Sequence, residues 1–511
     1  MHGLRTARAR WRGAIELIGL VAVVVAFIGM ASIHAFQQPP FAPPDETAHL
    51  GYAHEIADFR LPEIDRAPDI PDSAVQWAAE RSTARDERYL GVWVANHPPL
   101  NYVVTAPLIW LSDATDRADG GLLYMRLANV AMAAVGVVLT FALAGELAGG
   151  SRRVGLLAAA VVAAVPQGHG VFSQGLNDGM AFAVGTSVIW AGVRCLTRGA
   201  ARRDVVLLAA TSVVASGTRA ATMLLAIAVV GCVGAWQLAR GPSPVRERAV
   251  SALTVWLGAA IPMALAFGWF YLRNIHLYGD IGASDYLLRR FRRTRKGSVL
   301  SMMTRGHMWA NLYQRLTTPA TLGRRVPPGL TISAILMTAG VVGAAATGRP
   351  GGGATGDDPE ERTTFRAALG LCTIAVVVIA ATVAQHVSGG GNAYPRYLFP
   401  VLGVLAALAV VGLDRLVPYV APLALAVALG WWAILNLPVD VDPTRIRRPR
   451  DDGAPPVILQ VLPVGDGWRV AAGVLVAIGA IVAAVAMLAS TIGDARSRRA
   501  TTTEATAMSP V

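Results

Sequence analysis

The chain has 511 residues, of which 54% are hydrophobic and 15% are charged, and its formal net charge is +12. This composition excludes an ordinary soluble enzyme, and we expect no nucleic-acid partner for so apolar a chain. Apolar runs long enough to cross a bilayer recur along the sequence, which predicts an all-α polytopic membrane protein.

About twelve of these runs have the length and hydrophobicity of transmembrane helices. They lie near residues 14–34, 122–146, 154–172, 179–196, 204–217, 220–239, 251–272, 329–347, 366–386, 398–413, 416–437 and 469–490. The short run 204–217 is the weakest of the set. The first run is too long for a signal peptide and has no small-residue cleavage site, so we expect it to remain as an anchor.

Arginines in short loops predict the orientation, because basic residues near the ends of spans are retained in the cytoplasm. Such arginines occur before the first run and near 152–153, 198–203, 240–248 and 496–499. We therefore expect a plasma-membrane protein with both termini in the cytoplasm and with loops 35–121 and 273–328 outside.

Segment 348–364 divides the chain into two groups of helices. It contains Gly351, Gly352 and Gly353, followed by several acidic residues, a composition typical of a flexible linker. We expect this linker in the cytoplasm, between a transmembrane core at 1–347 and C-terminal helices at 365–490. A cytoplasmic tail, 491–511, is expected to follow.

Two acidic residues follow the first apolar run, in the sequence Pro43-Pro44-Asp45-Glu46. A carboxylate near hydrocarbon is costly unless it is paired or used, so we interpret this pair as the candidate reaction centre. Asp45 could serve as a general base or simply as a helix N-cap. Glu46 could take part in the reaction or only complement the helix dipole. If a helix starts at Asp45, then Asp45, His49 and Tyr52 share one face, where the last two could orient the acid or contact a substrate.

Basic residues are concentrated in the long loops, above all in 289–296 and 445–450. They could adhere to anionic membrane lipids or bind the phosphate of a lipid-linked substrate. The three cysteines have neither disulfide nor metal-ligand spacing. We expect no cofactor; a divalent metal stays open, although no ligand cluster is evident.

Several short motifs occur in a fixed order along the chain. They are Pro44-Asp45-Glu46, His97-Pro98-Pro99-Leu100, Tyr271-Leu272-Arg273-Asn274, Tyr278-Gly279-Asp280 and Tyr394-Pro395-Arg396-Tyr397-Leu398-Phe399-Pro400. In this order they resemble the GT-C superfamily of integral-membrane glycosyltransferases. The chain is similar in particular to the polyprenyl-phosphate-sugar-dependent branch that includes protein O-mannosyltransferases and aminoarabinose transferases.

The resemblance implies a GT-C-like N-terminal core with juxtamembrane helices on the outer face. It also implies an inverting transfer of a sugar from a polyprenyl-phosphate donor to a hydroxyl of an envelope glycan, lipid or protein. Asp45 matches the essential acid of the family, with Glu46 beside it. His97 stands where related enzymes have a basic residue, which suggests a phosphate contact, although a neutral hydrogen-bonding histidine fits equally.

The remaining candidates have equally plain alternatives. Arg219 matches a basic position of the family, but it could be a salt bridge between helices. Arg396 is the preferred phosphate ligand, with Arg273 as a helper, and either could instead be an interfacial arginine that reaches lipid headgroups. The family motifs also place Asn274, Tyr394 and Tyr397 among the substrate contacts. Asn177-Asp178 could meet sugar hydroxyls, but we interpret it as ordinary helix capping.

Other function classes remain open. A lipid or solute transporter or flippase would need many spans, and an envelope-assembly scaffold could keep the family fold without its activity. Because the unusual polar residues gather at one side of the apolar runs, we favour the enzyme. The Ala-, Val- and Arg-rich composition is typical of a GC-rich genome such as that of an actinobacterium, where polyprenyl-phosphate arabinose and mannose are plausible donors. With no soluble outer domain evident, we expect loops to recognise the acceptor, unless the acceptor is itself a lipid.

Overall fold

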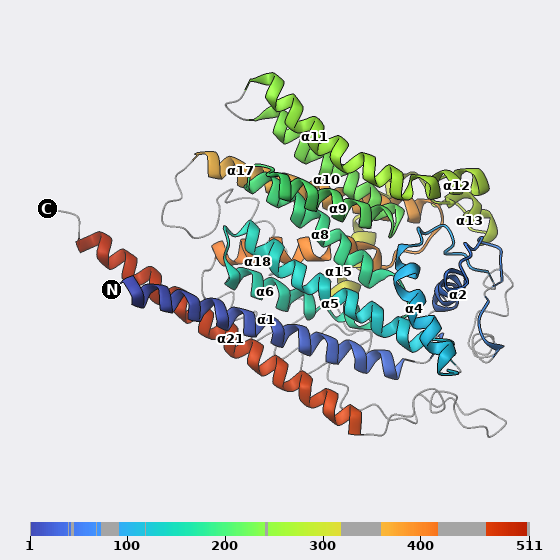
Figure 1. Ribbon diagram of the computed structural model, residues 1–511, viewed down its shortest axis with the longest axis horizontal. Coiled ribbons are helices and arrows are strands. Elements are labelled where there is room, and N and C mark those ends of the chain that lie inside the picture. The colour runs from blue at the N-terminus through green and yellow to red at the C-terminus, as the bar shows by residue number, and fades with distance from the viewer. Residues whose placement is uncertain are drawn as a thin grey trace.

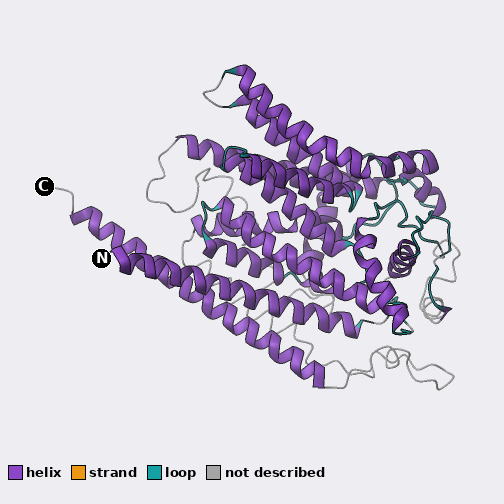
Figure 2. Ribbon diagram, in the orientation of Figure 1, coloured by secondary structure: helices purple, strands orange, loops and turns teal. Residues whose placement is uncertain are grey.

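A computed structural model describes residues 2–38, 40–41, 45–67, 69–72, 91–117, 119–240, 244–317, 359–416 and 467–507. Within these ranges the regular structure is entirely helical, as Figure 2 shows. Eight helical stretches in this part of the chain are long and apolar enough to cross a membrane. The prediction of an all-helical polytopic protein is therefore confirmed.

The expected count of about twelve spans is not confirmed. Two of the expected spans, 329–347 and 416–437, lie outside the described residues. The run 204–217 forms α9, Arg202–Ser216, which has only 15 residues. The run 154–172 was wrongly predicted as one span, since α6 (Arg152–Ala163) ends before α7 (Pro166–Phe172) begins. Pro166 explains the break, because proline has no N–H and its ring clashes with the preceding turn.

The centre of the bundle is formed by α5 (Leu122–Leu147), α6, α8 (Asp178–Thr197) and α18 (Leu402–Leu416). One flank carries α1 (His2–Gln37) packed along α21 (Gly467–Ala507), as Figure 1 shows. The other carries α9, α10 (Ala220–Ala239) and α11 (Val245–Met263). The helix α17, Pro359–Ser388, packs on α8 and α10 and begins within the predicted linker 348–364, whose earlier residues lie outside the described part.

Shorter elements complete the fold. They are α2 (Asp45–Ala57), α4 (Leu100–Ala114), the π-helix η3 (Ala264–Gly268), α12 (Trp269–Tyr278), α13 (Ser284–Arg290), α14 (Val299–Met303), α15 (Gly306–Thr317) and the 3-10 helix η5 (Pro395–Val401). In Figure 1, α2 is seen nearly end-on and runs across the long helices. It packs against α4 in a separate apolar cluster, where the Tyr52 and Tyr102 rings stack at 3.8 Å.

A glycine allows a close approach between two backbone segments. A Cβ atom at Gly185 of α8 would lie 2.1 Å from the Pro400 carbonyl oxygen of η5. Because any side chain would clash there, this glycine holds η5 directly against α8. The contact fixes the segment that carries Arg396.

The bundle has two distinct ends (Figure 1). The α2 end holds α2, α4, α12, α13 and the start of α8, whereas the terminal end holds the start of α1 and the end of α21. The described parts of loops 35–121 and 273–328 lie at the α2 end. The arginine-bearing loops near 152 and 198 lie at the terminal end, near both chain ends. The predicted outer loops therefore lie together at one end of the bundle, and these arginine-bearing loops lie at the other, as the predicted topology requires. Which end faces outward stays a prediction.

Candidate functional site

Asp45 and Arg396 meet at the α2 end although 351 residues separate them. Asp45 is the first residue of α2, and its Oδ2 accepts a hydrogen bond from Nη2 of Arg396, in η5. Their side chains are 25% and 18% exposed. The structure thus brings together the predicted acid and the preferred cation in a contact that is partly open to solvent.

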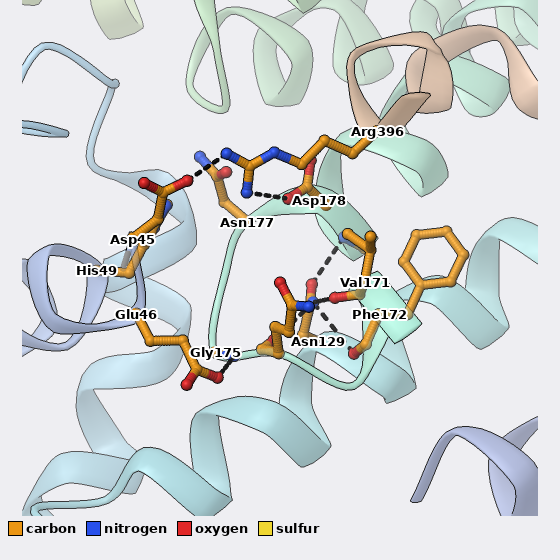
Figure 3. A network of polar contacts seen from close by, with 12 residues as sticks. Asp45, Glu46, His49, Asn129, Val171, Phe172, Gly175, Asn177, Asp178 and Arg396 are labelled. Atoms are coloured by element: carbon orange, nitrogen blue, oxygen red, sulfur yellow. Dashed lines mark hydrogen bonds and ion pairs between the residues drawn. The ribbon is translucent and has the colours of Figure 1, made fainter. Parts of the chain in front are cut away.

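Arg396 lies between two acids, as Figure 3 shows. Its Nη1 is 3.9 Å from Oδ2 of Asp178, the first residue of α8. Asp178 is fully buried, and its Oδ1 is 2.9 Å from Nη1 of Arg219. We call Asp45, Asp178, Arg219 and Arg396 the charged quartet. Its two acids and two bases give it no net charge.

Asn177 connects the quartet to His97. Its Oδ1 accepts a 2.8 Å hydrogen bond from Nε of Arg219, and its Nδ2 lies 3.2 Å from Nδ1 of His97. The interpretation of Asn177 as a side-chain cap is wrong, because the side chain of this N-terminal residue makes no capping hydrogen bond to α8. Arg219 forms a salt bridge between helices, which was the alternative to a substrate contact, through its contact with Asp178. This salt bridge lies within the polar cluster that contains the quartet and Asn177.

Asn129 of α5 supports the loop before α8. Its Nδ2 donates to the carbonyls of Phe172 and Gln174 at 3.1 and 2.9 Å, and its Oδ1 accepts from the Gly179 N–H at 2.7 Å. Any side chain at Gly179 would clash, since its Cβ would be 2.2 Å from the Asn129 carbonyl oxygen. This buried amide therefore fixes the turn that presents Asn177 and Asp178 (Figure 3).

The buried His49 and the half-buried His97 form a pair beside the quartet, with ring centroids 6.1 Å apart. The Tyr102 hydroxyl lies 2.8 Å from Nδ1 of His49. Burial, and then the charge of Arg219, hold the pKa of each histidine well below 6.5. Both rings are thus neutral at pH 7, so His97 offers hydrogen bonding rather than charge.

Tyr52 takes part in packing rather than facing the quartet. Its ring stacks on Tyr102, and its hydroxyl donates to the His97 carbonyl at 2.9 Å. Burial raises the pKa of Tyr52, so the phenol stays protonated. This hydrogen bond holds the loop that carries His97 against α2.

Glu46 is directed away from the quartet and is fully buried. Its Oε1 and Oε2 accept from Nε and Nη2 of Arg126 at 2.8 and 2.7 Å. The same carboxylate accepts from the N–H groups of Phe41 and Gly175, at 3.0 and 2.9 Å. Glu46 thus ties α2 to α5 and to the loop before α8.

Arg273 and Asn274 of α12 contact loop backbone. Nη2 of Arg273 donates to the Pro62 carbonyl at 2.9 Å. Nδ2 of Asn274 donates to the carbonyls of Asn96 and Ile281, at 2.9 and 3.1 Å. Asn274 therefore positions the segment that leads into His97, and Arg273 fixes the loop after α2.

Two tyrosines flank Arg396. The Tyr394 and Tyr397 ring centroids lie 5.6 and 5.4 Å from its guanidinium carbon, within cation–π range. Tyr394 is 38% exposed. These rings pack against the guanidinium of a side chain that stays 18% exposed.

Arg126, Asn129 and Asp178 are important site residues that sequence reasoning missed or read as ordinary. Arg126 carried a usable signal: a charge near the start of an apolar span requires a partner. In the part of the chain that the structure describes, no group of three or more His, Cys, Asp or Glu side chains could hold a metal ion.

No protein-family model matches the sequence, and no curated protein does. Among solved structures, the chain is similar to ArnT from Cupriavidus metallidurans bound to undecaprenyl phosphate, with 17% identity and a TM-score of 0.47. That alignment covers 94% of this chain and 77% of ArnT. The apo structure of ArnT gives 17% identity and a TM-score of 0.46, with 94% and 76% coverage. At this identity the similarity concerns the fold alone.

Proposed function

We propose that the chain is an inverting membrane glycosyltransferase that moves a sugar from a polyprenyl-phosphate donor to an acceptor hydroxyl. The observation that carries the proposal is the contact of the partly exposed Asp45 carboxylate with Arg396 at one end of an apolar helix bundle. A lipid phosphate lies at this depth in a membrane, and the sugar it carries would project toward α2.

In this reaction the acceptor oxygen attacks the anomeric carbon while the bond from that carbon to the phosphate oxygen breaks. Asp45 takes the hydroxyl proton as general base. Arg396, with Arg219 behind it, stabilises the charge that develops on the departing polyprenyl phosphate. Both arginines can form charge-assisted hydrogen bonds to phosphate oxygens.

The other predicted site residues take supporting roles in this proposal. His49 and His97 are neutral hydrogen-bonding groups beside the sugar position. Tyr394 and Tyr397 hold Arg396 and offer ring faces to the sugar. Glu46 anchors α2 through Arg126, and its carboxylate has no part in proton transfer.

The location of the reaction and its acceptor also belong to the proposal. The α2 end faces the outside of the plasma membrane, and the acceptor is an envelope glycan, lipid or protein. These assignments follow from the short-loop arginines at the terminal end and from the motif resemblance.

The direct test uses the purified full chain in proteoliposomes with radiolabelled polyprenyl-phosphate mannose and polyprenyl-phosphate arabinose. With an envelope extract as acceptor, we expect label to move from at least one donor to the extract in wild type and not in Asp45→Asn. Movement of intact donor across the bilayer without cleavage of the sugar bond would instead identify a flippase. Equal transfer by both proteins would refute the proposed chemistry.

A further inference from the structure

The charged quartet is neutral before any substrate arrives. Arg219 contacts Asp178, whereas Arg396 contacts Asp45 and Asp178. A polyprenyl-phosphate sugar is a phosphodiester with one negative charge. Its phosphate therefore has to replace a carboxylate in order to bind an arginine of the quartet.

The two acids differ in how easily they can be replaced. Asp178 is fully buried and contacts both arginines. Pulling it away would leave a buried charge without a partner, which is strongly destabilising. Asp45 is 25% exposed, and within the described part of the chain its carboxylate pairs with Arg396 alone, so water can solvate this carboxylate once Arg396 turns to another anion.

Resting on the proposed function, we infer that Asp45 is an exchangeable counter-ion of Arg396 and that Asp178 is the positioning residue that keeps Arg396 in place during the exchange. The donor phosphate takes the position of the Asp45 carboxylate at Nη2 of Arg396. Nη1 stays directed at Asp178, as in Figure 3. The guanidinium thus exchanges one anionic partner for another while its own position stays unchanged.

This exchange explains how one residue can be both held and reactive. While the pair is intact, Oδ2 of Asp45 is occupied by Nη2 of Arg396. When the phosphate takes the guanidinium, the Asp45 carboxylate is free to accept the proton of an acceptor hydroxyl beside the donor sugar. The donor must therefore bind before the acceptor is activated.

The charges balance through the cycle. During transfer the acceptor loses its proton to Asp45, and the phosphodiester becomes a phosphomonoester that carries the additional negative charge. When Asp45 later releases its proton to water, its carboxylate can pair with Arg396 again. That return displaces the polyprenyl phosphate product, so the same ion pair serves product release.

The test measures binding of undecaprenyl phosphate to the purified full chain in nanodiscs at pH 7, by native mass spectrometry. Asp45→Asn removes the competing carboxylate, and we expect it to bind the lipid at least about threefold more tightly than wild type, which is the scale of one partly exposed ion pair. Asp285→Asn is the matched control, because it breaks an exposed ion pair with Arg295 at the same end. It should bind like wild type.

Asp178 is tested by turnover. In Asp178→Asn, Asp45 is the one carboxylate of the quartet that remains beside Arg396, so donor binding releases Asp45 poorly. We expect kcat to fall at least about tenfold, the lower part of a general base's usual contribution, while undecaprenyl phosphate still binds. Asp178→Glu should restore part of kcat, because it returns the charge.

The outcomes separate this inference from the proposed function. If wild type binds and transfers but Asp45→Asn binds no more tightly, Asp45 is not the exchangeable group. Unchanged kcat in Asp178→Asn would remove the positioning role. If wild type itself does not bind undecaprenyl phosphate, the proposed function fails first.

Discussion

The two ends of the bundle carry a similar charge arrangement with different surroundings. At the terminal end, Arg153 contacts Asp414 and, at 2.9 Å, Asp494. This is again an arginine between two acids, as at Arg396. The acids of the terminal end stand on the long apolar helices α18 and α21 and connect them to α6.

At the α2 end the acid partners stand beside side chains that can bind a substrate. Asn177, the two neutral histidines and the tyrosines around Arg396 all lie within this cluster. Asp45 also belongs to a short helix rather than to a span. An arginine between acids is therefore no sign of catalysis by itself; the side chains around the acid decide.

The largest expected effect is a difference in labelling between the two ends of the bundle: in intact cells, a membrane-impermeant reagent should label a cysteine at one end and not at the other. We expect a membrane-impermeant maleimide to label Asp72→Cys in intact cells, because this exposed residue lies in the predicted outer loop. Arg202→Cys, exposed at the start of α9, should react only after permeabilisation. Wild type is the control for its own cysteines, two of which are buried. The reverse labelling pattern would place the site in the cytoplasm.

Asp45→Asn should lower turnover by about 10²–10⁴-fold while leaving the fold intact, since it removes a general base but keeps the shape. The matched variant is Asp414→Asn, in which Arg153 still has Asp494. It should keep turnover near that of wild type. Transfer assays on both purified proteins make the comparison, and more than about a tenth of wild-type turnover in Asp45→Asn would show that Asp45 is not the base.

The sequence predicted much of this site but not how its parts are paired. Asp45, Arg219, His97 and Arg396 were identified because motifs and interfacial charges are local signals. The pairing of Glu46 with Arg126 was not, since two residues 80 positions apart meet only through the packing of α2 on α5.

Local signals were also misread where packing decided the outcome. Asn177 before a helix is typical of a cap, but Arg219 and His97 compete for its side chain. The apolar run 154–172 suggested one span, and the break at Pro166 divides it into two helices. Hydrophobicity predicted the all-helical class well because it needs only composition and length.

Glu46→Gln should show whether Glu46 stabilises the fold while the adjacent Asp45 takes part in the reaction. Gln can still accept hydrogen bonds, but it breaks the buried ion pair between Glu46 and Arg126. Breaking a buried ion pair in this way costs about 3–5 kcal/mol. We expect a clear loss of thermal stability, detected with a thiol-reactive dye on the buried Cys195 and Cys372.

Turnover per folded Glu46→Gln molecule should stay within about tenfold of wild type, well short of the loss of a general base. Asp45→Asn should show the opposite behaviour, with normal stability and turnover lowered by about 10²–10⁴-fold. A folded Glu46→Gln protein as inactive as Asp45→Asn would return Glu46 to the reaction.

Arg396→Lys should recover only part of the activity lost in Arg396→Ala. The guanidinium directs Nη2 to Asp45 and Nη1 to Asp178, and a lysine ammonium cannot reproduce this planar fork. We expect Arg396→Ala to lose photo-crosslinking to a polyprenyl-phosphate probe as well as transfer. Arg295→Ala, which removes an exposed cation at the same end, should keep both. Full crosslinking and transfer in Arg396→Ala would leave Arg396 as an interfacial anchor.

The smallest effect concerns the pH dependence of stability. The pKa of His97 lies well below its usual 6.5, chiefly because the ring is buried, and Arg219 adds to the shift. In the unfolded chain this histidine takes up a proton as the pH falls below 6.5, whereas in the folded chain it stays neutral. Protonation therefore favours the unfolded state, and stability should be complete above pH 6.5 and decrease below it.

A histidine of this kind lowers the free energy of unfolding by at most about 1.4 kcal/mol for each pH unit below its unfolded pKa. Thermal unfolding followed by tryptophan fluorescence between pH 5 and pH 7 should thus show a falling midpoint on acidification, with a shallower slope in His97→Gln. Other buried histidines, such as His169, whose pKa is lowered to about 3, titrate in both proteins and cancel in the difference. The difference in slope between the two proteins isolates His97. Equal slopes would mean that the pKa of His97 is the same in the folded and the unfolded chain, so that His97 would take up a proton below pH 6.5 in the folded protein and could serve there as a cationic ligand for the donor phosphate.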